Sequence, residues 1–181
     1  MTLDPTRSGE NSGLFIFDIE NPVSPRLASS IVHPDEERKS YLVRDIAIQD
    51  RFIYAGLFGD KGLWMVDIAE PASPVDLGIA AVETNSNILV SGDYLFSSGQ
   101  LYNGIIVCDI SEPGNVKEAT RLDIPTRDCC LEISGDLLFM GIRNILTIYD
   151  ISKPENPVKL VDFELSLSGG CLLYTSDAAD E

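Results

Sequence analysis

Residues 62–71 form the string GLWMVDIAEP, an apolar run followed by an aspartate, an isoleucine and, four residues after the aspartate, a proline. The same pattern returns as GLFIFDIENP at 13–22, GIIVCDISEP at 104–113 and ILTIYDISKP at 145–154. The spacings between the four aspartates are 49, 42 and 41 residues, and the aspartates are Asp18, Asp67, Asp109 and Asp150. A period of about 40–50 residues indicates a repeat architecture.

Each interval between these segments holds two short runs of β-type residues around a tight Asp-Arg or Gly-Asp step. The runs are IAIQDRFIY at 46–54, ILVSGDYLF at 88–96 and LEISGDLLF at 131–139. Ile, Val, Phe and Tyr favour strands, and a tight step between two such runs is typical of a hairpin. No stretch of ten or more residues shows helical periodicity. One repeat therefore predicts four short antiparallel strands.

Four antiparallel strands in a repeat of this length predict one blade of a β-propeller. The first unit supplies only its last two strands, near 13–18 and 25–31, and both ends of the array should leave open sheet edges. We expect an all-β fold, a partial β-propeller over residues 1–170 with about three and a half blades of four-stranded antiparallel sheet. Its repeat units lie near 13–31, 44–82, 86–123 and 129–164, with strands near 44–49, 52–57, 62–67, 75–82, 86–91, 94–98, 104–109, 117–123, 129–134, 137–142, 145–150 and 158–164.

The shared pattern GLxVxDIxxPxxP resembles the LVIVD repeat, a β-propeller family of bacterial and archaeal proteins. A second proline completes it at Pro25, Pro74 and Pro157, and the resemblance covers roughly residues 13–165. It implies a propeller fold and an extracellular or cell-surface location for a secreted or exported protein. It carries over no catalytic residue.

The net charge and the length of the apolar runs limit the classes of partner that the chain could bind. The chain holds 13 Lys and Arg against 29 Asp and Glu, a net charge of -16, which argues against binding nucleic acid. No run approaches 18 apolar residues, so we expect no membrane insertion. The first residues show no signal peptide.

The last eleven residues, CLLYTSDAADE at 171–181, resemble the translation of a sequencing-library adapter. We exclude them from fold reasoning and expect the natural protein to continue beyond this point. Three cysteines then remain, Cys108, Cys129 and Cys130, and we expect all three to be reduced and packed.

Two interpretations exist for the repeated aspartates Asp18, Asp67, Asp109 and Asp150. They could form a ring of carboxylates for a metal or substrate, or each could accept backbone N–H groups from the turn that follows it. We favour the structural role, because it recurs in every blade whereas a site usually draws different residues from different blades.

A candidate binding site follows from the topology, since the chain enters the innermost strand of each blade at one mouth of the central channel. Those positions carry Arg44, Asp45, Asn87, Arg127 and Asp128, which could bind a polar ligand or bridge adjacent blades. We favour bridging. The longest insertion, at 33–40, is a further candidate for a binding face.

Three functions remain open at this stage. The first is a non-catalytic module that binds a protein or glycan, and whether the chain is an enzyme stays undecided with a leaning toward no. The second is part of a propeller enzyme, a hydrolase or a quinoprotein-like oxidoreductase, whose site lies on other blades. The third is a calcium-stabilised surface protein, which ranks last because no Asp-x-Asp-x-Asp loop supports ligation. We therefore expect no cofactor, with calcium as the weak exception, and no metal site or catalytic residue.

Overall fold

The computed structural model describes residues 13–32, 43–57, 62–84, 86–98, 104–124, 129–164 and 166. The insertion at 33–40, the residues Arg127 and Asp128, and the tail 171–181 lie outside the described residues. Every described element is a strand, and the strands are β1 (Gly13–Asp18), β2 (Arg26–Val32), β3 (Val43–Gln49), β4 (Phe52–Leu57), β5 (Gly62–Asp67), β6 (Val75–Ala80), β7 (Ser86–Ser91), β8 (Tyr94–Ser98), β9 (Ile105–Asp109), β10 (Lys117–Leu122), β11 (Cys130–Ser134), β12 (Leu137–Ile142), β13 (Ile145–Asp150) and β14 (Val158–Glu164).

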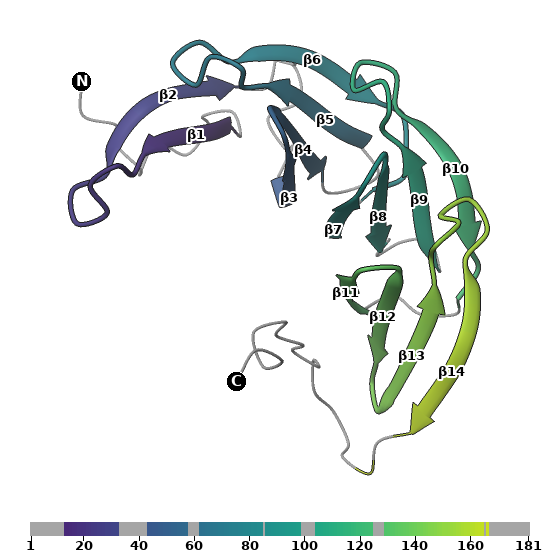
Figure 1. Ribbon diagram of the computed structural model, residues 1–181. Helices are drawn as coiled ribbons and strands as arrows, with labels where there is room; N and C mark the ends of the chain where they lie inside the picture. The colour runs from purple at the N-terminus through teal and green to yellow at the C-terminus, as the bar shows by residue number, and fades with distance from the viewer. Residues whose placement is uncertain are drawn as a thin grey trace.

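The strands form one two-stranded sheet, β1-β2, and three four-stranded sheets in simple chain order, β3 to β6, β7 to β10 and β11 to β14. All pairs are antiparallel. The four sheets fan around a common centre, with β3, β7 and β11 innermost and β2, β6, β10 and β14 along the outer rim (Figure 1). The predicted β-propeller architecture is confirmed, with blade 1 as a half blade and blades 2 to 4 complete.

The predicted strands match the observed ones to within two residues. The largest difference is β6, which ends at Ala80 where the sequence suggested 82. The chain leaves the sheet there because Val82 is buried and its carbonyl accepts the N–H of Thr84, which turns the chain toward blade 3.

Each outer strand carries a β-bulge at the same place in the repeat. The pairing register shifts opposite Ile16/Phe17, Met65/Val66 and Ile148/Tyr149, and between Glu118 and Thr120. A bulge strengthens the local twist of a strand. The bulge is therefore a repeated feature of the backbone that the aspartate and proline pattern does not predict.

The glycine at the start of strand three in blades 2 and 3, Gly62 and Gly104, is required for a steric reason. Gly62 and Gly104 have φ of 104° and 132°, where residues with a side chain are rare. A Cβ atom at Gly62 would lie 2.2 Å from the carbonyl oxygen of Ala80, and one at Gly104 would lie 2.1 Å from that of Leu122. Glycine thus lets strand three start in close contact with the outer strand.

The hydrophobic core lies between the blades. One cluster joins Leu14 of blade 1 to Trp64 and Val66 of blade 2, a second joins blades 2 and 3, and a third joins blades 3 and 4. The sheets of blades 2 and 3 therefore bury one set of alternating side chains against the preceding blade and the other set against the following blade. Within the part of the chain that the structure describes, there is no helix that could span a membrane.

Candidate functional site at the starts of the inner strands

The four repeated aspartates serve the turns that follow their strands. The carboxylate of each accepts the backbone N–H two residues later, from Glu20, Ala69, Ser111 and Ser152, at donor–acceptor distances of 2.9, 2.8, 2.9 and 2.8 Å. This is the Asx-turn geometry that the structural interpretation predicts.

Two of these aspartates have carboxyl groups with a shifted pKa. The Ser111 hydroxyl, at 2.6 Å, and the Ser111 N–H hold the pKa of Asp109 below its usual value. The N–H of Ser152 lowers the pKa of Asp150 in the same way. Both groups therefore stay ionised through the neutral range, where their charge strengthens the turn bond.

Asp45 links blade 2 to blade 3. Its Oδ2 accepts the backbone N–H of Ile88, on β7 of the next blade, at 2.7 Å. Its Oδ1 accepts the N–H of Ile46 at 2.9 Å. The Asp45 carboxylate, which the sequence places at the mouth of the channel, thus accepts a hydrogen bond from one backbone N–H in each of two blades.

Asn87 makes the corresponding link from blade 3 to blade 4. Its Nδ2 donates to the carbonyl oxygen of Cys129 at 2.9 Å and to the hydroxyl oxygen of Ser98 at 3.1 Å. The residue has a φ of 49°, a left-handed conformation that asparagine tolerates better than most residues, and β7 is irregular at this point. The bulge directs the amide across the gap between blades.

The structure thus brings the first predicted mouth residues together at one end of the inner strands. Arg44 precedes Asp45 in an irregular part of the β3–β4 pairing and has an exposed side chain. Asp45 adjoins the start of β7, and Asn87 adjoins the start of β11. Bridging accounts for the carboxylate and the amide, while a binding role for these positions, and for Arg127 and Asp128, stays a prediction.

Further contacts between blades have no counterpart in the sequence pattern. Gln49 Nε2 donates to the carbonyl of Gly92 at 2.8 Å, and the Tyr94 hydroxyl donates to Glu155 at 2.6 Å. The bond to Glu155 raises the pKa of Tyr94 to about 12. Each contact joins residues that occupy different places in the repeat, so a periodic motif gives no signal for it.

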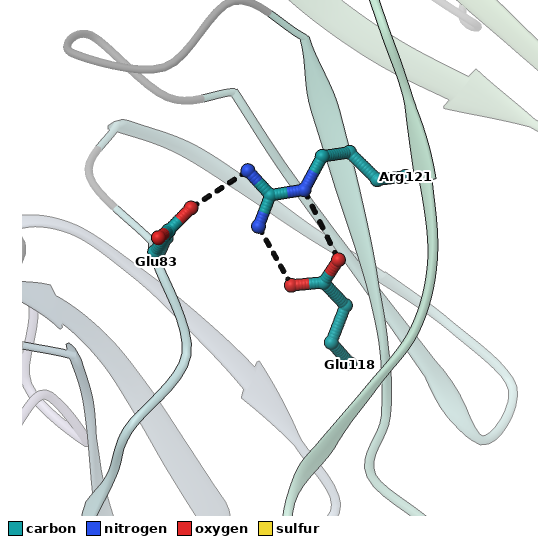
Figure 2. A network of polar contacts seen from close by, with 3 residues as sticks. All are labelled: Glu83, Glu118 and Arg121. Atoms are coloured by element: carbon teal, nitrogen blue, oxygen red, sulfur yellow. Dashed lines mark hydrogen bonds and ion pairs between the residues drawn. The ribbon is translucent and has the colours of Figure 1, made fainter.

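An ion-pair network also crosses from blade 2 to blade 3 (Figure 2). Arg121 on β10 contacts Glu118 of its own strand through Nε and Nη2, at 3.0 and 2.8 Å. Its Nη1 lies 2.6 Å from Glu83, in the segment that leads out of blade 2. The bond to Glu118 is the main cause of a raised pKa for Arg121.

The cysteines depart in part from the expectation. Cys108 and Cys129 are buried and form no disulfide bond, and burial raises the pKa of the Cys108 thiol to about 12. Cys130 is disulfide-bonded, so the expectation that all three are reduced is wrong for this residue. Neighbouring residues on an extended chain point to opposite faces, so Cys129 packs into the core between blades 3 and 4 while Cys130 points away from it.

Side chains that could bind a metal ion do not cluster within the described ranges. These residues contain no group of three or more His, Cys, Asp or Glu side chains that could hold a metal ion. Calcium binding by the chain stays an untested expectation.

A family model for the LVIVD repeat matches residues 9–32, 42–81, 84–123 and 128–162. The chain belongs to the LVIVD repeat family. The four matched segments coincide with blades 1 to 4, so the resemblance seen in the sequence is confirmed. No curated protein matches the chain.

Solved structures share the fold of this LVIVD protein at low sequence identity. A protein from Lactobacillus plantarum superposes with a TM-score of 0.66 at 13% identity, over 83% of this chain and 50% of that one. A provisionally named 6-phosphogluconolactonase from Bacteroides fragilis gives 0.58 at 16% identity, over 70% and 40%. A functionally unknown protein from Desulfotomaculum acetoxidans gives 0.51 at 11% identity, over 86% and 64%. The chain spans less than two thirds of each of these proteins.

Proposed function

We propose that this chain is a non-catalytic LVIVD propeller module that binds a protein or glycan partner at the starts of its inner strands, as part of a bacterial or archaeal protein that is exported or held at the cell surface. The observation that carries the proposal is the convergence of polar positions from successive blades. Asp45 contacts the start of β7, and Asn87 contacts the residue before β11. These two contacts link the starts of three neighbouring inner strands, and we call the linked positions the polar rim.

The hydrogen bonds between blades make this rim suitable for recognition. They hold neighbouring strand starts at fixed separations, so a partner would meet preorganised groups and lose little affinity to ordering them. Arg44 adds an exposed guanidinium beside Asp45 in a chain whose net charge is -16. A cation with several donors in an acidic surface suits carboxylates or the hydroxyl-rich face of an acidic sugar.

The test is binding of the labelled 181-residue chain to an array of neutral and acidic oligosaccharides and to acidic peptides. Arg44→Ala should lower the signal for the bound class at least tenfold, while Lys153→Ala, which removes an exposed cation from a turn after β13, should leave it unchanged. Equal binding by the two variants, or no binding to any probe, would count against the proposed site.

A second candidate rests on the likeness to the Bacteroides fragilis protein, whose name indicates a lactonase. A hydrolase built on this fold would accelerate opening of 6-phosphogluconolactone above the spontaneous rate. The rate of proton release from the lactone at neutral pH, measured with the native chain and with a boiled sample, distinguishes the two candidates. Catalysed opening would favour the enzyme and displace the binding module.

A further inference from the structure

The turn between β12 and β13 holds an arginine in an uncommon backbone conformation. Ile142 pairs with Ile145, so the turn consists of Arg143 and Asn144. Arg143 has a φ of 54°, in the left-handed region where tight hairpin turns usually place glycine, asparagine or aspartate. The residue is exposed, and none of the described carboxylates forms an ion pair with it. An arginine at a strained position that no ion pair explains is a candidate functional residue.

Arg143 lies at the same end of the fold as the polar rim. The start of β11 pairs with the end of β12, and Arg143 follows directly after β12. The residue before β11 accepts a hydrogen bond from Asn87, and Asp45, beside Arg44, accepts the N–H of Ile88 on β7. Strand pairing and hydrogen bonds therefore connect Arg44 in blade 2, through Asn87 in blade 3, to Arg143 in blade 4.

The opposite end of the fold is acidic. The turns between strands one and two of blades 2 to 4 each contain an aspartate, and a repeated aspartate ends strand three of every blade. Arg51, in the first of these turns, is paired with Asp67 at 3.1 Å. Arg44 and Arg143 are thus exposed cations at one end of a chain whose net charge is -16, and the acidic end repels an anionic ligand.

We propose that the polar rim binds an acidic oligosaccharide, a chain of uronic acid sugars, and that Arg44 and Arg143 each pair with one of its carboxylates. The inference rests on the proposed function and specifies its ligand. A planar guanidinium matches a carboxylate through two parallel N–H···O bonds, which gives direction as well as attraction. Blade 4 thereby contributes a specificity-determining residue that the repeated sequence pattern does not contain.

The position between the two arginines favours a sugar over an acidic peptide. Asn87 uses its Nδ2 for bonds to Ser98 and to the carbonyl of Cys129. Its Oδ1 accepts no hydrogen bond from the described residues and suits a hydroxyl donor. A uronic acid chain carries hydroxyl groups between its carboxylates. Its rings are also stiffer than a peptide, so it loses less conformational freedom on binding.

The probe is a fluorescently labelled oligogalacturonate, and its methyl ester is an uncharged probe of matching shape. Titration with the 181-residue chain should give saturable binding of the acid by anisotropy. The ester should bind about tenfold more weakly or worse, because it lacks the charge that strengthens the bonds to arginine.

The variant Arg143→Gly separates recognition from stability. Glycine adopts a positive φ without strain, so the variant should melt close to the parent by circular dichroism. Its affinity for the acid should nevertheless fall about tenfold, because one bidentate pair is lost. Lys153→Ala, which removes an exposed cation at the acidic end, is the control and should bind as the parent does.

Three results would overturn the inference. Equal affinity for the acid and the ester, or unchanged affinity for the acid in Arg143→Gly, would overturn it while leaving the binding module in place. Tighter binding of a labelled glutamate oligomer than of the acid would overturn it in favour of an acidic peptide. Absence of binding by all three probes would instead count against the proposed function, and the inference would fall with it.

Discussion

Trp64 and Phe15 occupy the same place in two repeats, three residues before the repeated aspartate, yet their surroundings differ completely. Trp64 on β5 is 0% exposed, whereas Phe15 on β1 is 53% exposed. Both point toward the side of the preceding blade. Leu14 of blade 1 packs against Trp64, whereas no described residue of another blade covers Phe15. Burial in this fold is therefore a property of neighbouring blades and not of the single sheet.

The difference between Trp64 and Phe15 indicates that contacts between blades supply most of the stabilising free energy. A sheet whose two faces are both apolar gains little alone, and each blade becomes stable when its neighbours remove both faces from water. Each prediction below contrasts a residue in a complete interface with one whose interface is absent or local.

The largest contrast is expected between Trp64→Ala and Phe15→Ala. The first removes a fully buried indole and its 2.9 Å bond to Asp76, so the free energy of unfolding should fall by about 3–5 kcal/mol. The second removes a half-exposed ring and should cost about 1 kcal/mol or less. Urea unfolding followed by far-ultraviolet circular dichroism measures both. Similar losses would contradict the view that blade contacts bury the core.

The next contrast concerns Asp45. Asp45→Ala leaves the buried N–H of Ile88 without its acceptor, which should lower the free energy of unfolding by about 1–3 kcal/mol. Asp45→Asn keeps a carbonyl acceptor and should recover most of the loss. Hydrogen exchange at Ile88 gives a local readout, since exchange should accelerate in the alanine variant more than in the asparagine variant. Unchanged exchange in both would show that the bond between blades does not hold β7.

The fold could be predicted from the sequence because each repeat contains short-range residue patterns that define its own strands and turns. The aspartate and proline that stand at Asp67 and Pro71 recur in each blade, and the starting glycine at Gly62 recurs in the first three. Tight turns and alternating apolar runs define strands without reference to distant parts of the chain. The contact of Arg121 with Glu83 could not be predicted in this way, because it depends on how two blades are rotated about the axis. The disulfide of Cys130 was missed for the same reason, since a pairing between cysteines depends on three-dimensional distance.

Glu83→Ala tests an ion pair that spans two blades. Arg121 keeps both bonds to Glu118, so the guanidinium stays paired and the loss should be about 0.3–1 kcal/mol. Lys159→Ala, which breaks a pair with Asp162 within β14, should cost less than Glu83→Ala, because both groups of this pair are exposed to water. Both losses should shrink in 1 M salt, where the screening length falls to about 3 Å. A larger loss for Lys159→Ala would show that connecting blades gives this ion pair no advantage.

The smallest effect is expected at the Asx turns, which are local and do not depend on a neighbouring blade. Asp18 in the half blade makes the same bond as Asp109 in blade 3. Because the pKa of Asp109 is lower in the folded chain than its usual value of about 3.9, its contribution to stability is present above that value and is lost as pH falls through the lowered pKa. Asp109→Asn keeps an acceptor for the turn but cannot titrate. Its urea midpoint should therefore lie close to the parent's at pH 7 and fall slightly less between pH 5 and pH 3. An equal or steeper acid decline in the variant would show that the Asp109 carboxylate does not contribute to acid sensitivity, and that the protonation events which destabilise the chain lie elsewhere.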